Sequence, residues 1–375
     1  MQYLFWLLIL IIFFIYIGYP IFLGILSYKR IQNRIKKEYF PSVTLIIAAH
    51  NEEQVIENKI ESVLSQDYPK DKLQIVVASD ASTDRTNQIV RYYSQRGIEL
   101  YDQKEHKGKS AALNYAVQNI ARGEIIVFND ATTLIERDAI RKITSYFSDD
   151  KIGAVAGKLI FKNSAESTIT ENYSLYWRYE EFLRESESKI GYLPFVSGAF
   201  YAVRKRLYTP VAENLPDDSV SPLGVYKQGF TVAYAKDAVA YEAGAQDAGG
   251  EFRIKTRGVV RELSSILHFR GLLNPFKYPA LSLVLISHRL LRWSAPIFLI
   301  ALFLANIGLL GNPLYMAFFW MQISFYLLAL CGLFIRKKIR IVGLPFYFSL
   351  VNIAALWGII KFLSGRKVAT WKSVR

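Results

Sequence analysis

The sequence predicts an α/β domain with a mostly parallel β-sheet, flanked by transmembrane helices near the N- and C-terminal ends. Three observations lead to this prediction: charge-free apolar runs near both ends, alternating strand and helix patterns between them, and basic clusters beside the apolar runs. The chain has 375 residues, of which 52% are hydrophobic, and a formal net charge of +14. This composition excludes a disordered or collagen-like chain.

The first element expected is a membrane anchor at residues 1–28. Residues 3–27 form a run of 25 residues without a charged side chain, which is long enough to cross a hydrocarbon core of roughly 30 Å. This run is too long for the apolar part of a signal peptide. Residues 29–40 form a basic linker, which carries Lys29, Arg30, Arg34, Lys36 and Lys37. By the positive-inside rule, this linker places the following domain in the cytoplasm.

A second apolar region, residues 294–364, is expected to hold the C-terminal membrane segments. Its first two charge-free runs, 294–311 and 313–334, predict a hairpin with a tight external turn. The last run, 341–363, has basic residues on both sides. A full crossing and a re-entrant or interfacial segment therefore remain alternatives for this run.

The other basic residues also gather at the borders of the apolar runs. Residues 267–293 combine apolar side chains with His288, Arg289 and Arg292, which is typical of interfacial helices. Residues 365–375 form a basic tail. Because the positive charge lies beside membrane segments, we expect a lipid bilayer as partner and no nucleic acid. The single cysteine, Cys331, excludes a disulfide framework and a thiolate metal site.

Between the membrane regions, residues 41–266 are expected to form one domain of alternating strands and helices. Buried-strand runs are expected at 43–48, 73–77, 98–101 and 124–128. Apolar residues recur at helical spacing between these runs, so the pattern predicts βαβ units and a mostly parallel sheet. Ligands bind such sheets beyond the carboxyl ends of the strands, and polar residues follow each of the expected strands.

Two classes of nucleotide-binding protein are excluded because the sequence lacks their motifs. No G-x-G-x-x-G follows a strand, so a hydride-transferring Rossmann enzyme has no support. The segment Gly108-Lys109-Ser110 is similar to the end of a P-loop, but Gln103 stands where the first glycine of that motif belongs. A nucleoside triphosphatase is therefore rejected.

A set of motifs in order along the chain resembles the family 2 inverting glycosyltransferases. The motifs are PSVTLIIAAHNEE at 41–53, VVASDASTDRT at 76–86, KGKSAALN at 107–114, IVFNDATT at 126–133, SGAFYAVR at 197–204, LPDDSV at 215–220 and EFRIKTRGVVR at 251–261. With the flanking apolar segments, they are similar to the membrane-bound branch that contains cellulose, hyaluronan and poly-N-acetylglucosamine synthases. The resemblance implies a GT-A fold, a nucleotide-sugar donor, usually a UDP-sugar, and a divalent metal.

The resemblance also implies which residues bind the donor. Asn51 and Glu53 match residues that line the nucleoside pocket, Asp80 matches the aspartate that accepts a hydrogen bond from the base, and Lys109 matches a residue near the diphosphate. The residue types fit, because a base N–H needs an acceptor and a diphosphate needs cations. Purely structural roles remain open for three of them: a turn or helix cap for Asp80, a solvated helix start for Lys109, and a first-turn acid for Glu53.

Metal binding is expected at Asp130, which falls on the first acid of the D-x-D signature of the family. The second acid is replaced by Thr132. One carboxylate, phosphate oxygens and waters could hold Mg²⁺ or Mn²⁺, since both ions prefer oxygen ligands.

The catalytic acid pair of the family is matched by Asp217 and Asp218. One carboxylate of this pair takes the proton of the acceptor hydroxyl as that oxygen attacks the anomeric carbon, and we favour Asp218 over Asp217. An ordinary exposed acidic turn or a helix N-cap also fits these two residues. Gly198 is expected to let the acceptor approach closely, because glycine has no side chain, although a plain tight turn also fits.

The last motif departs from the polymer-forming synthases, which carry Q-x-x-R-W near the membrane. Here Arg253, Arg257 and Arg261 recur every four residues, which places them on one helix face. This face could neutralise the departing diphosphate or bind lipid head groups, and we favour Arg257 for the first role. The tryptophan usually helps to hold a polymer. Without it, the sequence allows the addition of one or a few sugars, and processive synthesis is not established.

The functional hypothesis is an inverting glycosyltransferase of the hexosyltransferase type in the inner (plasma) membrane. It would move a sugar from a nucleotide-sugar donor, expected to be a UDP-sugar, to a lipid-linked or growing glycan acceptor in polysaccharide or envelope synthesis. Thr132 and the missing Q-x-x-R-W motivate an alternative: a catalytically weak nucleotide-sugar-binding protein that scaffolds or regulates a partner synthase.

Overall fold

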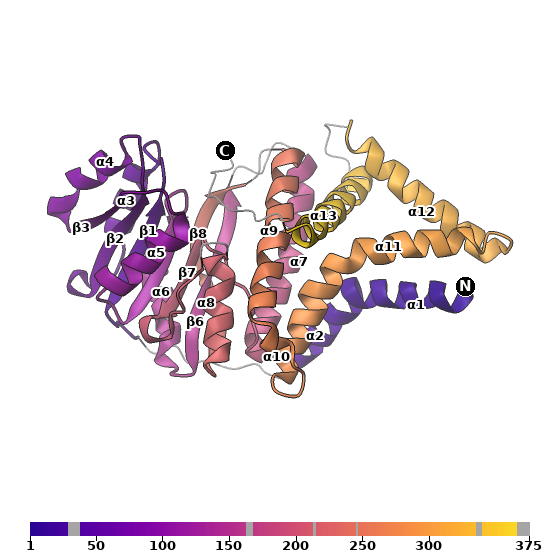
Figure 1. Cartoon of the computed structure of the whole chain (residues 1–375), viewed down its shortest axis with the longest axis horizontal. Coiled ribbons are helices and arrows are strands. Elements are labelled where there is room, and N and C mark those ends of the chain that lie inside the picture. Colours follow the sequence, from indigo (N-terminus) through magenta and orange to yellow (C-terminus); the bar gives the residue numbers. More distant parts are fainter. Residues whose placement is uncertain (29–37, 163–167, 213–214, 245–246, 335–339, 366–375) are drawn as a thin grey trace.

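The computed structural model describes residues 1–28, 38–162, 168–212, 215–244, 247–334 and 340–365. A mixed eight-stranded sheet lies at one end of the molecule, and long apolar helices lie at the other (Figure 1). In space the strands follow the order β3-β2-β1-β4-β7-β6-β8-β5. Their bounds are β1 Val43–Ala49, β2 Leu73–Asp80, β3 Ile98–Gln103, β4 Ile125–Asp130, β5 Leu134–Ile135, β6 Ile152–Lys162, β7 Phe200–Arg204 and β8 Thr231–Ala243.

The first half of the sheet is the parallel array that the alternation predicted. Strands β2 and β4 pair parallel with β1, and β3 pairs parallel with β2. All residues of β1 are buried, as expected of a central strand covered on both faces. The second half is mixed, because β7 runs antiparallel to both β4 and β6 and β5 runs antiparallel to β8.

Helices cover both faces of the sheet and form two apolar layers. One layer packs α3 (Ile56–Leu64), α4 (Thr86–Tyr92) and α6 (Ala139–Ser145) against the strands. The opposite layer is built on α5 (Lys109–Tyr115), α8 (Asp217–Lys227) and α9 (Ala248–His268). The short helical turns are η2 Lys70–Lys72, η3 Ser94–Arg96, η4 Ala116–Ile120, η5 Tyr146–Ser148, η6 Lys205–Leu207 and η7 Arg270–Leu273.

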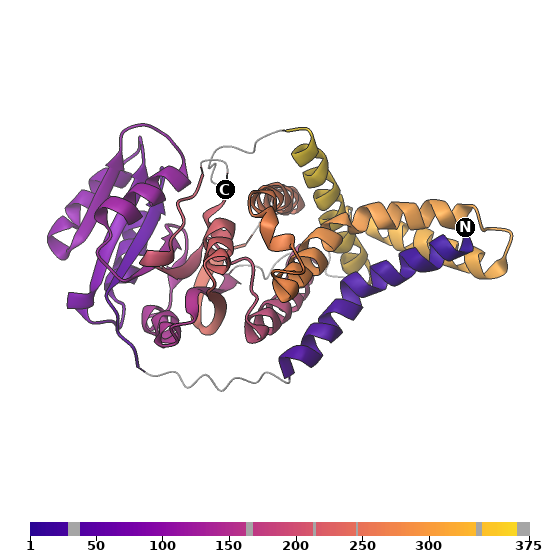
Figure 2. The same cartoon turned by 60° about the horizontal axis from the view of Figure 1, so that its bottom comes forward.

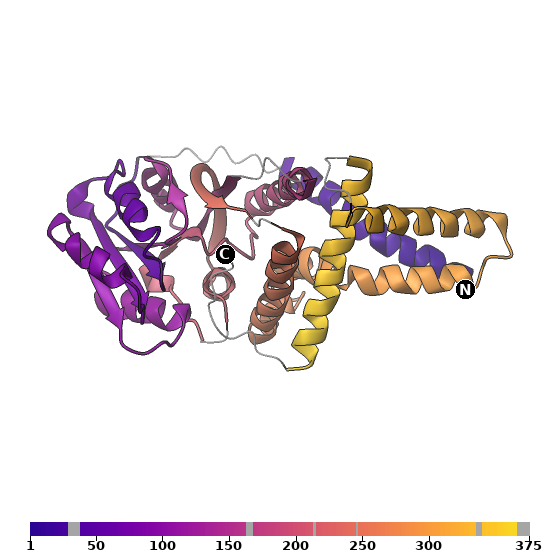
Figure 3. The same ribbon diagram turned by 90° about the horizontal axis from the view of Figure 1, so that it is seen from above.

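Within the described residues, four helical stretches are long and apolar enough to cross a membrane: Gln2–Tyr28, Pro279–Ile307, Pro313–Cys331 and Ile341–Leu363. They comprise α1 Gln2–Phe13, η1 Phe14–Gly18 and α2 Tyr19–Tyr28, then α10 Pro279–Val284, η8 Leu285–Leu291 and α11 Arg292–Ile307, then α12 Pro313–Cys331 and α13 Arg340–Leu363. Helices α1, α11 and α12 project away from the sheet together (Figures 2 and 3). The expected border between residues 293 and 294 falls inside the continuous stretch Pro279–Ile307.

Two helices, α7 (Thr168–Ile190) and α9, lie between the sheet and the apolar helices (Figure 3). Helix α9 packs tightly on α13, since a Cβ at Gly358 would lie 2.8 Å from the Cβ of Val259. Helix α7 is held by buried polar contacts, in which Glu187 accepts from the Tyr19 hydroxyl at 3.0 Å and meets His288 Nδ1 at 2.5 Å. The sheet domain is thus fixed to the apolar helices through buried contacts.

Candidate active site

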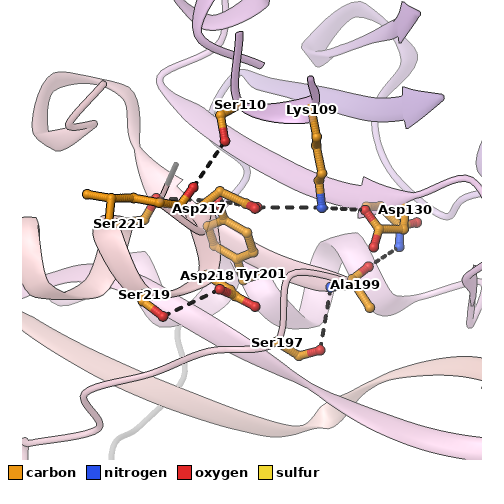
Figure 4. A network of polar contacts seen from close by, with 12 residues as sticks. Lys109, Ser110, Asp130, Ser197, Ala199, Tyr201, Asp217, Asp218, Ser219 and Ser221 are labelled. Carbon is orange, nitrogen blue, oxygen red and sulfur yellow. Dashed lines mark hydrogen bonds and ion pairs between the residues drawn. The ribbon is translucent and has the colours of Figure 1, made fainter. Parts of the chain in front are cut away.

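The candidate site gathers loops that are far apart in the sequence (Figure 4). Asp130 ends β4, Lys109 begins α5, and Asp217 begins α8. The Lys109 ammonium lies between two carboxylates, 2.7 Å from Asp130 Oδ1 and 3.7 Å from Asp217 Oδ2. The structure therefore brings together a cation and two acids that the sequence analysis assigned to three different motifs.

Lys109 is positioned by the turn that precedes it. Gly108 has φ +89°, a left-handed conformation that glycine adopts without strain, and it ends the turn at the first residue of α5. Burial alone would lower the pKa of the Lys109 ammonium, but the carboxylates of Asp130 and Asp217 raise it above its ordinary value. Lys109 therefore remains a fixed positive charge at the end of the sheet.

The two adjacent acids on α8 have different surroundings. Asp217 is only 2% exposed, and its Oδ2 accepts a hydrogen bond from the Tyr201 hydroxyl at 3.2 Å. Asp218 is partly buried, and this burial raises its pKa to about 6. Asp217 also raises the pKa of Asp218, whereas Arg261 and Lys109 lower it. Asp217 is thus held by structural partners, whereas Asp218 is the acid with a pKa suited to a base near neutral pH.

Gly198 lies directly against Asp218. A Cβ built at Gly198 would come within 3.3 Å of Asp218 Oδ2 and 3.5 Å of Asp218 Cβ. The backbone also joins the two segments, since the Val196 N–H donates to the Asp218 carbonyl at 3.1 Å. The absence of a side chain at Gly198 therefore leaves the Asp218 carboxylate uncrowded on this side.

Arg257 contributes positive charge to the same site from α9. Burial and the neighbouring Arg261 lower the pKa of Arg257, whereas Asp218, Asp130 and Glu242 act in the opposite direction. Arg257 therefore lies in the same electrostatic neighbourhood as carboxylates of β4, α8 and β8. The sequence analysis had no reason to include Glu242, whose pKa is raised to about 7 by burial and by Asp130.

Asp80 lies in a second polar cluster, at the carboxyl end of β2. Its side chain is fully buried, and its Oδ1 accepts from Gln103 Nε2 at 2.5 Å and from the Lys107 N–H at 3.0 Å. Its Oδ2 lies 2.9 Å from Nδ1 of His106. The His106 ring stands 4.4 Å from that of His50, and His50, Asp80 and His106 together offer three ligand atoms within 4.8 Å.

Asn51 and Glu53 connect the loop after β1 to the loop after β2. Asn51 adopts φ +55°, which asparagine tolerates better than most residues, and its Oδ1 accepts from the Thr83 N–H at 2.8 Å. Glu53 Oε2 accepts from the Arg85 N–H at 3.1 Å. These contacts place both residues beside the Asp80 cluster, where they connect the two loops.

Lys59 is a buried residue that the sequence analysis missed. Its ammonium donates to Asn129 Oδ1 and to the Thr133 carbonyl, the two residues on either side of the Asp130 loop. Burial lowers its pKa to about 7, although Asp130 opposes this shift. Its position was a usable signal, because Lys59 shares a helix face with the apolar residues Ile56 and Ile60.

The residues around Asp130 suit a hard divalent cation. The Asp130 carboxylate, the Thr132 hydroxyl and the Glu242 carboxylate offer oxygen donors of the type that Mg²⁺ and Mn²⁺ prefer. The carboxylates of Asp130, Asp217, Asp218 and Glu242 share this electrostatic neighbourhood with the cations Lys59, Lys109, Arg257 and Arg261.

Comparisons with known proteins agree with this architecture. Residues 44–209 match the family model "Glycosyl transferase family 2". The "Probable glycosyltransferase YdaM" of Bacillus subtilis is 29% identical over 239 residues, which cover 58% of this chain and 56% of that protein. The "Poly-beta-1,6-N-acetyl-D-glucosamine synthase" of Staphylococcus aureus is 23% identical over 229 residues, covering 60% of this chain and 55% of the synthase. The chain thus spans about half the length of these curated relatives.

The fold is shared over almost the whole chain with a solved structure. The mannosyltransferase PcManGT from Pyrobaculum calidifontis, solved in complex with GDP-Man and Mn²⁺, superposes with a TM-score of 0.73 at 22% identity. The match covers 97% of this chain and 99% of that one. The predicted GT-A fold is confirmed. Residues 44–209 thus form a glycosyl transferase family 2 domain, as the motifs predicted.

Proposed function

We propose that the protein is an inverting glycosyltransferase that acts at a membrane surface. The single observation that carries this proposal is the arrangement of Lys109 between Asp130 and Asp217, with Asp218 one residue further and Gly198 against it. The proposal is supported by the positive charge of Lys109 near Asp218, a carboxylate whose pKa is raised to about 6 by burial. The family 2 domain and its glycosyltransferase relatives support the same activity.

In this proposal Asp218 accepts the proton of the acceptor hydroxyl while the acceptor oxygen attacks the anomeric carbon of the donor sugar. The bond between that carbon and the diphosphate breaks on the opposite side, so the anomeric configuration inverts. Lys109 and Arg257 neutralise the diphosphate that leaves. A divalent cation held by Asp130 would supply further charge stabilisation of the diphosphate.

We propose that Asp80 accepts a hydrogen bond from the nucleobase of the donor, with Asn51 and Glu53 holding the surrounding loops. Asp80 Oδ1 already accepts two protein hydrogen bonds, which leaves Oδ2, beside His106, as the acceptor for a base N–H. We infer a UDP-sugar as the first donor class to test. GDP-mannose belongs in the same panel, because the structural neighbour was solved with GDP-Man.

The acceptor is proposed to be a lipid-linked or growing glycan that reaches Asp218 along the membrane. Helix α9 supports this proposal because it connects Asp218 to an apolar helix. Its residues Arg257 and Arg261 interact electrostatically with Asp218. Thr256 and Val259 on the same helix contact α13. The basic residues that flank the apolar helices support an inner-membrane, multi-pass location with the catalytic domain in the cytoplasm. The domain borders predicted from the sequence remain part of this proposal.

The test is nucleotide release by the purified protein in detergent with bacterial membrane lipids as acceptor. UDP-glucose, UDP-N-acetylglucosamine, UDP-galactose and GDP-mannose are supplied singly with Mg²⁺, Mn²⁺ or EDTA. We expect release from one donor, dependent on the lipid and abolished by EDTA. Nucleotide binding without release from any donor would contradict the proposal and favour a scaffold that regulates a partner synthase.

A further inference from the structure

Glu242 stands at the end of β8, where the sheet meets the loop that follows β4. Residues 134–135 of β5 pair antiparallel with β8, with Leu134 opposite Tyr241 and Ile135 opposite Ala240. Extending this register by one residue puts Glu242 opposite Thr133. Glu242 therefore lies next to the loop of Asp130 and Thr132, although more than a hundred residues separate them in the sequence.

The Glu242 carboxylate has no protein partner among the residues that the structure describes. No hydrogen bond or ion pair joins it to a described side chain, whereas the neighbouring Glu136 accepts from the Tyr241 hydroxyl at 2.7 Å. Glu242 is nevertheless partly buried, so its carboxylate is withdrawn from solvent. A partly buried acid without a partner is costly unless a ligand supplies the missing interactions.

The charges around Glu242 indicate the kind of ligand. Asp130 acts on Glu242 more strongly than any other charged group, ahead of Lys109 and Arg257. Two carboxylates that act on each other in a partly buried site repel each other, and a cation between them relieves that repulsion. Lys109 and Arg257 relieve this repulsion only in part, because the Lys109 ammonium also lies 3.7 Å from Asp217 Oδ2 and Arg257 also interacts with Asp218.

We propose that Glu242 is a metal ligand of the transferase site and replaces the second acid of the D-x-D signature, the position that Thr132 occupies here. The donor set would then combine the carboxylates of Asp130 and Glu242, from β4 and β8, with oxygens of the nucleotide diphosphate. Two carboxylates are a common protein contribution to a Mg²⁺ or Mn²⁺ site that is completed by phosphate and water. This inference rests on the proposed function, since it concerns the metal of that same site.

The experiment measures Mn²⁺ binding directly, by electron paramagnetic resonance of free Mn²⁺ in titrations of the full-length protein in detergent with UDP or GDP. Glu242→Gln is expected to weaken Mn²⁺ binding by about tenfold or more, the range found when metal-site partners are removed. Glu242→Asp keeps the charge but draws it back by one methylene, so it should weaken binding less. Glu136→Gln is the matched control, and its Mn²⁺ affinity should equal that of the wild type.

A rescue variant separates a ligand from a structural residue. Thr132→Asp combined with Glu242→Gln restores the family's second acid and should recover most of the Mn²⁺ affinity, which a merely structural role for Glu242 would not allow. Mn²⁺ affinities of Glu242→Gln and Glu242→Asp within twofold of wild type would overturn the proposal. The titration does not depend on turnover. If Glu242→Gln loses Mn²⁺ binding and the wild type transfers sugar from no donor, the proposed function is refuted and the metal assignment stands.

Discussion

The buried ammonium of Lys59 makes a pH-dependent contribution to stability that one substitution removes. Lys59 is 0% exposed, and burial lowers its pKa from 10.5 to about 7. The folded protein then binds fewer protons at this residue than the unfolded chain does between about pH 7 and pH 10.5. The free energy of unfolding should therefore rise with pH across this window, by up to about 1.4 kcal/mol per pH unit.

Lys59→Met removes this dependence and two hydrogen bonds at once. At neutral pH the buried charge costs on the order of 5 kcal/mol, which the methionine does not incur. The variant leaves Asn129 Oδ1 and the Thr133 carbonyl without their donor, at a cost of about 1–3 kcal/mol each. The two effects nearly cancel at about pH 7, so the two proteins should have similar free energies of unfolding there. Between about pH 7 and pH 9 the free energy of unfolding of the wild type should rise by about 2–3 kcal/mol relative to that of the variant.

The assay is denaturant unfolding of wild type and variant in detergent, followed by tryptophan fluorescence at several pH values. Lys227→Met, which changes an exposed lysine at the end of α8, is the matched control and should track the wild type. If the free energies of unfolding of Lys59→Met and wild type change equally with pH between about pH 7 and pH 9, the reasoning is refuted.

Three further predictions concern activity and nucleotide binding. Because burial raises the pKa of Asp218 to about 6 and a base must be ionised, the transfer rate should rise through about pH 6 and then level off; a rate independent of pH between about pH 5 and pH 7 speaks against this role. Gly198→Ala brings a methyl group within 3.3 Å of Asp218 Oδ2, so turnover should fall about tenfold while nucleotide affinity, measured by calorimetry, stays unchanged. Asp80→Ala removes the acceptor of Gln103 and Lys107, and nucleotide affinity should drop by roughly tenfold to a hundredfold; unchanged affinity would exclude Asp80 from base recognition.

The parallel half of the sheet was predictable because each of its strands is a short apolar run followed by polar residues. The predicted strand at 43–48, for example, is β1 at Val43–Ala49. The antiparallel β7 was not foreseen, because its buried residues Phe200–Arg204 carry no mark of strand direction. Pairing direction depends on connections through the whole domain, which local patterns do not encode.

The candidate site was predictable where a motif placed its residue directly after a strand or at the start of a helix. Asp130, Lys109 and Asp217 are such residues, and the structure brings them within reach of one another. Glu242 was missed, because it reaches the site only through the pairing of β8 with β5. Asn51 and Glu53 were assigned to the nucleoside pocket, yet their hydrogen bonds with Thr83 and Arg85 could be known only from the fold.

The central claim is that Asp218 is the base of a glycosyl transfer, and Asp218→Asn tests it most directly. The variant keeps the size and shape of the side chain but cannot accept the proton of the acceptor hydroxyl. The measurement is nucleotide release by wild type and Asp218→Asn with the same donor and membrane-lipid acceptor, with nucleotide affinity measured in parallel. We expect release to fall by at least about a hundredfold with affinity retained. Release at the wild-type rate by Asp218→Asn would contradict the account.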